Sequence, residues 1–225
     1  MIKIDGRDSI VFERIEGPSM WQLLLEDPSK MAGLTRQMIE VQQAINGVEA
    51  PQGVPDLSGR ICSKIAEACL LTPEERDSAL GMTKSLPSGV SLCHGDLHPG
   101  NILMGENGPV VIDWFDAGSG HCAADSVRTS LLIRPPGNGG EPPHLPGASR
   151  ALLEAMHRIY LEDVVARSGG TVPELLHWER VLAASRLAED TNTDHDDLLA
   201  LWRTSGGPDG VTTQLADELA GLGFS

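Results

Sequence analysis

Apolar residues recur at helical spacing along most of this chain, and this pattern predicts a mainly helical protein. Capping residues mark two helix starts: Ser19 precedes a helix from Met20, and Thr72 with Glu75 opens another. Further helices are predicted at residues 29–45, 57–70, 73–86, 123–133, 149–168, 173–189 and 195–204, with a short amphipathic segment at 215–222. Helices therefore lie before and after a central region that lacks this period.

Short runs of β-branched residues predict strands at the start and in the centre of the chain. The first run culminates in Ile10-Val11-Phe12, within a strand expected over residues 10–15. Three central strands are expected near residues 91–93, 102–104 and 110–112, with Asn107-Gly108 as a tight turn between the last two. The Pro- and Gly-rich residues 134–147 predict a loop. The predicted fold class is α+β: mostly helical, with a small β-hairpin platform.

Composition narrows the class of protein. A chain of 225 residues with 40% apolar residues can bury a sizeable core. The 32 acidic and 17 basic residues give a formal net charge of −15, which argues against nucleic acid or an anionic membrane as partner and would attract cationic small molecules. The four cysteines form no CxxC pair, and no signal peptide or membrane-spanning apolar run is visible. We expect a reduced, cytoplasmic protein.

The most specific chemical signal is the segment from His94 to Asn101, followed by Val110-Val111-Ile112-Asp113. Phosphoryl transfer to a hydroxyl requires a carboxylate near the attacking oxygen and divalent cations near the phosphates. Asp96, after a predicted buried strand, is the candidate base. Asn101, at the start of the next short strand, and Asp113, at the end of the facing strand, carry the hard oxygen ligands that Mg²⁺ prefers. His94 is interpreted as a backbone anchor of the loop rather than a ligand.

The sequences HGDLHPGNIL and VVIDWFDAG resemble the aminoglycoside phosphotransferase and choline kinase family, whose fold is similar to that of protein kinases. The resemblance implies Asp96 as catalytic base, Asn101 and Asp113 as magnesium ligands, and Asp125 as structural support of the catalytic loop. It also implies ATP (or GTP) and Mg²⁺ as cofactors and a small-molecule alcohol, such as an aminoglycoside-like compound, as acceptor.

The same resemblance suggests a division of the chain into three parts. Residues 1–17 correspond to a remnant of the N-terminal lobe with its hinge strand, where Glu13, Arg14 and Ile15 would contact the nucleotide base. Residues 18–205 correspond to the helical C-lobe with the catalytic loop, and residues 206–225 to a tail with a short helix. An exposed hinge strand would be an unpaired edge, through which a homodimer could form.

The family's small lobe normally includes a phosphate-covering loop and a lysine, but only Met1 to Ser9 precede the predicted strand here. None of the four lysines, Lys3, Lys30, Lys64 and Lys84, stands where that lysine is expected. Losing charge-assisted phosphate contacts, worth about 1.5–3 kcal/mol each, predicts weak nucleotide binding and impaired transfer. A gene start assigned too late would also explain the short lobe.

Two other functions remain open. The chain could be a kinase-like binding or scaffold protein without turnover. Less favoured is a metal-dependent phosphoesterase, in which soft zinc ligands would come from Cys93, His94, His98, His121 and Cys122. On the acceptor side, Glu189-Asp190 and Asp194 to Asp197 lie in the right region, but a solvated acidic loop is the simpler interpretation. No acceptor-binding residue is assigned.

Overall fold

The computed structural model describes residues 2–137, 139–142, 144–167, 172–189, 195–204 and Gly221. The α-helices are α1 Met20–Glu26, α2 Met31–Asn46, α3 Leu57–Glu67, α4 Pro73–Ser85, α5 Cys122–Ile133, α6 Arg150–Arg167, α7 Val172–Arg186 and α8 His195–Thr204. The strands are β1 Ile2–Ile4, β2 Arg7–Ser9, β3 Ser91–Cys93, β4 Ile102–Gly105, β5 Gly108–Val111 and β6 Gly118–Gly120. The short 3-10 helices are η1 Pro28–Lys30, η2 Pro99–Asn101 and η3 Trp114–Asp116. The predicted α+β class, mostly helical, is confirmed.

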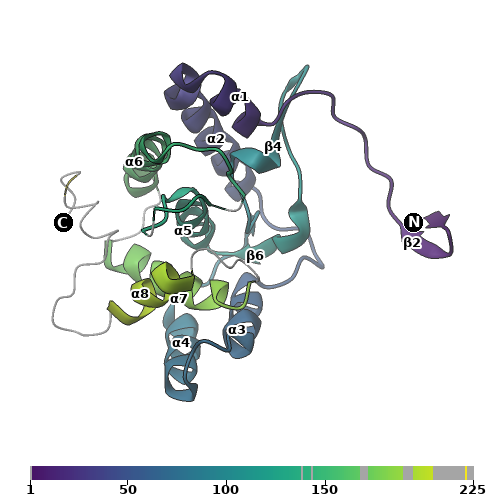
Figure 1. Ribbon diagram of the computed structural model, residues 1–225. Helices are drawn as coiled ribbons and strands as arrows, with labels where there is room; N and C mark the ends of the chain where they lie inside the picture. Colours follow the sequence, from purple (N-terminus) through teal and green to yellow (C-terminus); the bar gives the residue numbers. More distant parts are fainter. Residues whose placement is uncertain are drawn as a thin grey trace.

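Helix α5 occupies the middle of the fold, between two groups of helices (Figure 1). On one side α3, α4, α7 and α8 share a core that includes Ile61, Trp178 and Trp202. On the other side α1, α2 and α6 share a core around Met38 and Tyr160. Residues of α5 contribute to both cores. Burial on both sides fixes α5, so groups that it carries have rigid positions.

The strands form three separate two-stranded antiparallel sheets: β1 with β2, β3 with β6, and β4 with β5. Strand β6 was not predicted, because Gly118-Ser119-Gly120 contains no apolar residue. Glycine is required there by close packing: a Cβ on Gly120 would lie 2.8 Å from the Leu57 side chain. The sheets β3–β6 and β4–β5 carry the segment 94–101 between them.

Most predicted helix boundaries agree with the structure to within a few residues. Ser19 and Thr72 both form capping boxes, with Gln22 and Glu75 respectively. The turn between β4 and β5 is formed by residues 106–107, one position earlier than predicted. The helix expected at 215–222 lies outside the described residues, apart from Gly221. In the part of the chain that the structure describes, no helix is long and apolar enough to cross a membrane.

The predicted hinge strand over residues 10–15 is wrong. The chain instead pairs β1 with β2 around Asp5-Gly6, whose φ angles of 50° and 77° suit the tight turn of a two-residue hairpin. This hairpin stands off from the body at the end of an extended segment (Figure 1). Ile10, Val11 and Phe12 in that segment have 67–79% of their surface exposed and belong to no strand of the described chain.

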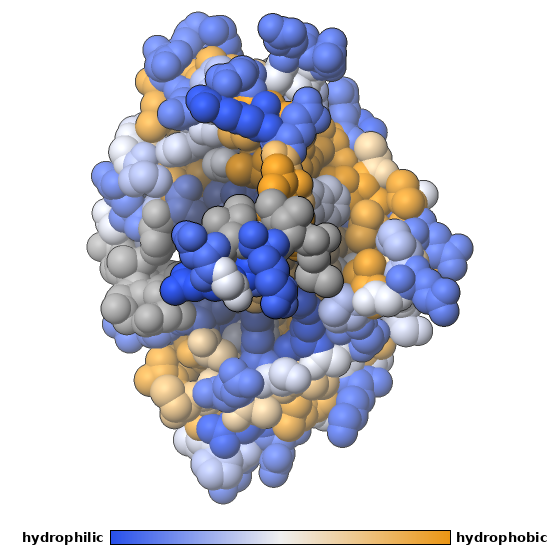
Figure 2. Space-filling view, turned by 90° about the vertical axis from the view of Figure 1, so that its right-hand side faces the viewer, coloured by the Kyte–Doolittle hydropathy of each residue, from blue (hydrophilic) through white to orange (hydrophobic). Residues whose placement is uncertain are grey.

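Viewed from the side on which the hairpin projects, hydrophilic side chains stand at the front of the molecule, with hydrophobic areas above and beside them (Figure 2). Charged residues on and between β1 and β2 account for this, since Lys3, Asp5, Arg7 and Asp8 are all exposed. The pair Lys3–Asp8, at 3.9 Å, is likewise exposed and adds little stability.

Candidate functional site

The loop after β3 is held by hydrogen bonds from its own first residue. His94 is fully buried, and its Nδ1 accepts the backbone N–H of Asp96 at 3.2 Å. Its Nε2 lies 3.0 Å from the carbonyl oxygen of Ile112, at the end of β5. Because Nδ1 accepts, Nε2 carries the proton and donates. His94 therefore joins the Asp96 loop to the residue that follows β5.

Asp125, in the first turn of α5, holds the same loop through its side chain. Its Oδ1 accepts the N–H of Gly95 at 2.8 Å, and its Oδ2 accepts Asn46 Nδ2 at 2.9 Å. Gly95 adopts φ +78°, and a Cβ there would lie 2.3 Å from the carbonyl oxygen of Asp116. Only glycine fits this position without displacing the backbone. The bend that presents Asp96 is thus fixed from both sides.

Asp96 and Asn101 are joined directly. Asn101 Nδ2 donates to the Asp96 carbonyl oxygen at 2.9 Å and to Asp96 Oδ2 at 3.3 Å. The Asn101 side chain is therefore oriented through its nitrogen, and no described residue donates to its amide oxygen. His98 closes the loop: its Nδ1 accepts the N–H of Gly100 at 3.1 Å. Burial, with His144, His94 and Arg128 nearby, lowers the pKa of His98 to about 3, so this imidazole is neutral.

Asp113 stands at the same end of the β4–β5 hairpin as Asn101. The link is the hydrogen bond from Ile112 N–H to the Asn101 carbonyl oxygen, at 3.0 Å. Asp113 has φ 61° and ψ 62°, a left-handed conformation that turns the chain out of β5, and its side chain is exposed. Left-handed conformations are uncommon for residues other than glycine and often occur at functional sites.

The donor set fits magnesium better than zinc. Asn101 and Asp113 supply an amide and a carboxylate oxygen, and Mg²⁺ commonly takes one or two protein ligands, with water and phosphate completing the shell. Among the described residues, no group of three or more His, Cys, Asp and Glu side chains could hold a metal ion. His121 caps α5 instead, accepting Ala123 N–H at 3.3 Å, and the Cys93 thiol lies near backbone carbonyls.

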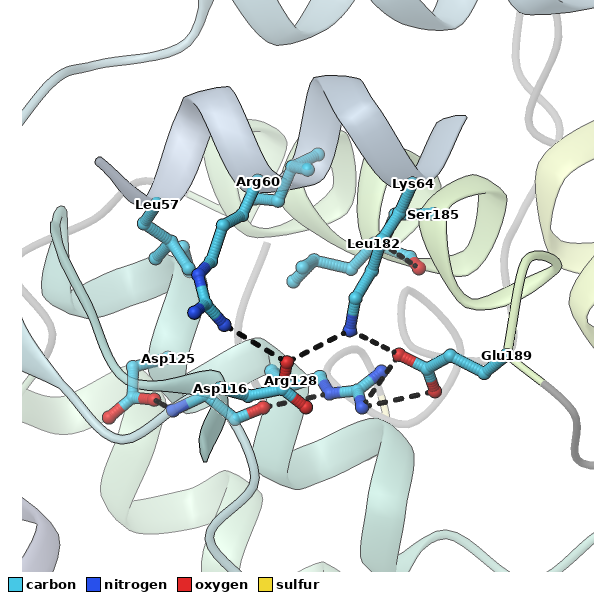
Figure 3. Close-up of a pocket in the computed structure, with 12 residues that line it drawn as sticks. Leu57, Arg60, Lys64, Asp116, Asp125, Arg128, Leu182, Ser185 and Glu189 are labelled. Carbon is cyan, nitrogen blue, oxygen red and sulfur yellow. Dashed lines mark hydrogen bonds and ion pairs between the residues drawn. The ribbon is translucent and has the colours of Figure 1, made fainter. Parts of the chain in front are cut away.

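A partly buried network of charged side chains, which the sequence did not predict, joins Lys64, Arg128 and Glu189 (Figure 3). Arg128 of α5 is 7% exposed; its Nε donates to the Gly95 carbonyl oxygen at 3.1 Å, and its Nη2 lies 3.5 Å from Asp96 Oδ1. Arg128 also pairs with Glu189 at 2.9 Å, and Lys64 of α3 reaches Glu189 at 2.9 Å. Lys64, Arg128 and Glu189 are far apart in the chain and meet because α3, α5 and α7 pack together. No local sequence pattern predicts these ion pairs.

Of the acceptor-side candidates that the structure describes, Glu189 is the one that lies near the Asp96 loop, through its ion pair with Arg128. Burial alone would raise the pKa of this carboxyl, but Arg128, Lys64 and Arg186 together lower it to about 2. Asp197 lies elsewhere and accepts the N–H of Gly137 at 2.7 Å. Asp190 and Asp194 lie outside the described residues.

The residues expected to bind the nucleotide base are not in contact with the Asp96 loop. Glu13 and Arg14 are exposed, and within the described residues Arg14 pairs only with Glu16, at 3.0 Å. Ile15 lies against Gly105, at the turn of the β4–β5 hairpin. The chain then runs along β4, where Met104 N–H donates to the Pro18 carbonyl oxygen at 2.9 Å. This segment thus lies beside the β4–β5 hairpin, at the end opposite to Asn101 and Asp113.

A comparison with models of protein families agrees with the motif. The sequence profile described as "Phosphotransferase enzyme family" (APH) matches residues 4–142, more than half of the chain. No curated protein matches the chain. Among solved structures, the chain is similar to a crystal structure of aminoglycoside-3'-phosphotransferase of type VIII, with 17% sequence identity, a TM-score of 0.41, and coverage of 77% of this chain and 67% of that one. From the family match over residues 4–142, we conclude that the chain belongs to the APH phosphotransferase enzyme family.

Proposed function

We propose that this chain catalyses phosphoryl transfer from ATP or GTP to a hydroxyl group of a small molecule. The observation that carries the proposal is that the oxygen-bearing side chains of Asp96, Asn101 and Asp113 lie at the same end of the β4–β5 hairpin. Asn101 is bonded to the Asp96 carboxylate at 3.3 Å, and Ile112 joins Asn101 to the strand end that carries Asp113. Phosphoryl transfer depends on this combination of a base and metal ligands.

Asp96 is suited to orient the attacking hydroxyl and accept its proton. The carboxylate has 27% of its side-chain surface exposed, so an acceptor can reach it. Its contacts to Asn101 and Arg128, at 3.3 and 3.5 Å, are long and leave lone pairs for a further hydrogen bond. A base in this position contributes about 10²–10⁴-fold to the rate.

The magnesium ion, when bound through Asn101 and Asp113, would neutralise charge on the transferred phosphate. The chain's own contribution is to fix these ligands. Asn101 is 8% exposed and locked by its bonds to Asp96, whereas Asp113 extends from the hairpin as an exposed carboxylate. A rigid ligand beside an accessible one allows the ion to arrive with its nucleotide.

A binding protein without turnover is the second candidate, and the lysines favour it. Lys3 pairs with Asp8, and Lys30 pairs with Asp27. Lys64, on α3, pairs with Asp116. Lys84 is exposed on α4. All four lysines of the sequence are described, and none lies beside the β4–β5 hairpin to hold nucleotide phosphates. This placement predicts weak nucleotide affinity for the chain.

Transfer of a labelled γ-phosphate from Mg·ATP to a panel of small-molecule alcohols tests the proposal. Asp96→Asn keeps the size of the side chain and removes its basicity, so we expect at least a ~100-fold lower rate. Asp77→Asn, on the exposed face of α4, is the matched control and should keep the wild-type rate. Equal rates for Asp96→Asn and wild type would exclude Asp96 as the base. Nucleotide binding without transfer would favour the second candidate.

A further inference from the structure

A pocket beside the catalytic loop lies between α3, α5 and the end of α7, with Gly95 of the loop in its wall (Figure 3). Six of its lining residues have ionisable side chains: Arg60, Lys64, Asp116, Asp125, Arg128 and Glu189. Because Arg128 also reaches Asp96, the pocket adjoins the carboxylate that would receive the acceptor hydroxyl. The charges on this wall therefore act on an acceptor bound at Asp96.

Lys64 occupies a site between two carboxylates. From α3 its ammonium points down between Asp116 and Glu189, at 3.3 Å from Asp116 Oδ1 and 2.9 Å from Glu189 Oε1 (Figure 3). An ammonium donates up to three hydrogen bonds, and two of them are used here. This is the arrangement with which two acidic residues bind an amine, and here the amine belongs to the chain itself.

Asp116 and Glu189 each pair with further cationic side chains of the same chain. Asp116 Oδ1 also pairs with Arg60 at 3.2 Å. Glu189 also pairs with Arg128 at 2.9 Å, and lies 3.5 Å from Arg186. Asp116 and Glu189 therefore each already face two or more cations. A cationic ligand would have to displace these partners before it gained any attraction.

We infer that Lys64 fills, from within the chain, the place between Asp116 and Glu189 that an amino group of a cationic acceptor would take, so that the acceptor is an uncharged polyhydroxyl compound. The second half of this inference rests on the proposed function. The net charge of −15 does not oppose it, because surface charges beyond ~8–10 Å are largely screened at physiological salt. Lys64, Arg60 and Asp116 keep 25–31% of their side-chain surface exposed, so hydroxyl groups can bond to them.

Removing the internal amine should create a binding site for an external one. Lys64→Ala deletes the atoms of n-propylamine, and propylammonium chloride is the probe. At a concentration about ten times its Kd, the probe should raise the melting temperature of Lys64→Ala by about 3–5 °C relative to sodium chloride. The wild type and Lys84→Ala, which removes an exposed lysine of α4, should show no difference between the two salts.

A double variant tests whether the amine binds at this site. Lys64→Ala with Asp116→Asn lacks one of the two carboxylates and should lose the propylammonium response. An equal response in the double variant, or the same response in the wild type, would overturn the inference, as would no response in Lys64→Ala. If Lys64→Ala does not fold, Lys64→Met keeps the apolar stem, and ammonium chloride against sodium chloride is compared instead, with the same outcomes.

These melting experiments require no catalysis, so their failure is distinct from failure of phosphoryl transfer. Where phosphoryl transfer is detected, the preference among acceptors tests whether the acceptor is an uncharged polyhydroxyl compound. The wild type should use an uncharged polyol such as inositol with at least ~10-fold higher kcat/KM than an aminoglycoside. The reverse preference, together with a positive amine response in Lys64→Ala, would overturn the assignment of the acceptor alone.

Discussion

Asp125 offers the sharpest test of how the catalytic loop is held. The side chain is 1% exposed and accepts two short hydrogen bonds, from Gly95 N–H at 2.8 Å and from Asn46 Nδ2 at 2.9 Å. Asp125→Ala removes both acceptors, so the buried Gly95 N–H loses its acceptor and Asn46 Nδ2 keeps its bond to the Leu92 carbonyl oxygen, at 3.0 Å. The loop would then lose the attachment through Asp125 and keep the hydrogen bond from Arg128 of α5 to the Gly95 carbonyl oxygen.

The size of the effect follows from these bonds. A hydrogen bond to a charged group contributes about 1.5–3 kcal/mol, so two give about 3–6 kcal/mol. The variant also no longer buries a carboxylate, which offsets part of the loss. We expect a decrease of about 3 kcal/mol in the free energy of unfolding, or roughly 6–12 °C in melting temperature for a chain of this size. Asp125→Asn retains one acceptor and should lose about half as much.

Urea denaturation measures the free energy of unfolding, and hydrogen exchange of the Gly95 amide reports on the loop itself. Asp77→Ala, an exposed aspartate on α4, serves as control and should change stability by less than about 0.5 kcal/mol. The reasoning is refuted if Asp125→Ala matches that control and the Gly95 amide remains equally protected.

Two further predictions concern the same loop and its charged support. Gly95→Ala places a Cβ 2.3 Å from the Asp116 carbonyl oxygen, at a residue with φ +78°. Urea denaturation should therefore show a free energy of unfolding that is lower by about 2 kcal/mol or more. The control Gly81→Ala, inside α4 with open space around it, should raise the free energy of unfolding by about 0.5–1 kcal/mol. The pKa of Glu189, lowered from 4.5 to about 2, gives stability that is present above pH 4.5 and is lost as the pH falls toward 2. Glu189→Gln should therefore flatten the dependence of unfolding free energy on pH in that window, and an unchanged slope would contradict the ion pairs with Arg128, Lys64 and Arg186.

Local sequence signals predicted the helices and the central hairpin well. Ser19 and Thr72 satisfy free backbone N–H groups within their own first turns, so four consecutive residues contain the whole signal. The segment 94–101 is similar, because its hydrogen bonds join residues of the same loop: Asp96 N–H donates to His94, and Asn101 donates to the Asp96 carbonyl oxygen. Such short-range interactions can be recognised without knowing the fold.

Features that depend on distant partners were missed. Strand β6 exists because Gly118-Ser119-Gly120 is small enough to pass Leu57 while pairing with β3. Conversely, Ile10-Val11-Phe12 has the composition of a strand, but no neighbouring strand pairs with it. The Lys64–Glu189–Arg128 network joins residues on three elements, and only tertiary packing brings them together. Composition alone could not distinguish these cases.

The central claim is that Asn101 and Asp113 hold the magnesium ion of a bound nucleotide. Calorimetric titration of Mg·ATP into wild type and Asp113→Asn tests it most directly, because asparagine tolerates the left-handed conformation of residue 113 and removes only the charge. We predict at least ~10-fold weaker magnesium-dependent binding for Asp113→Asn than for wild type and for the control Asp77→Asn. Equal affinities for all three proteins would contradict the assignment.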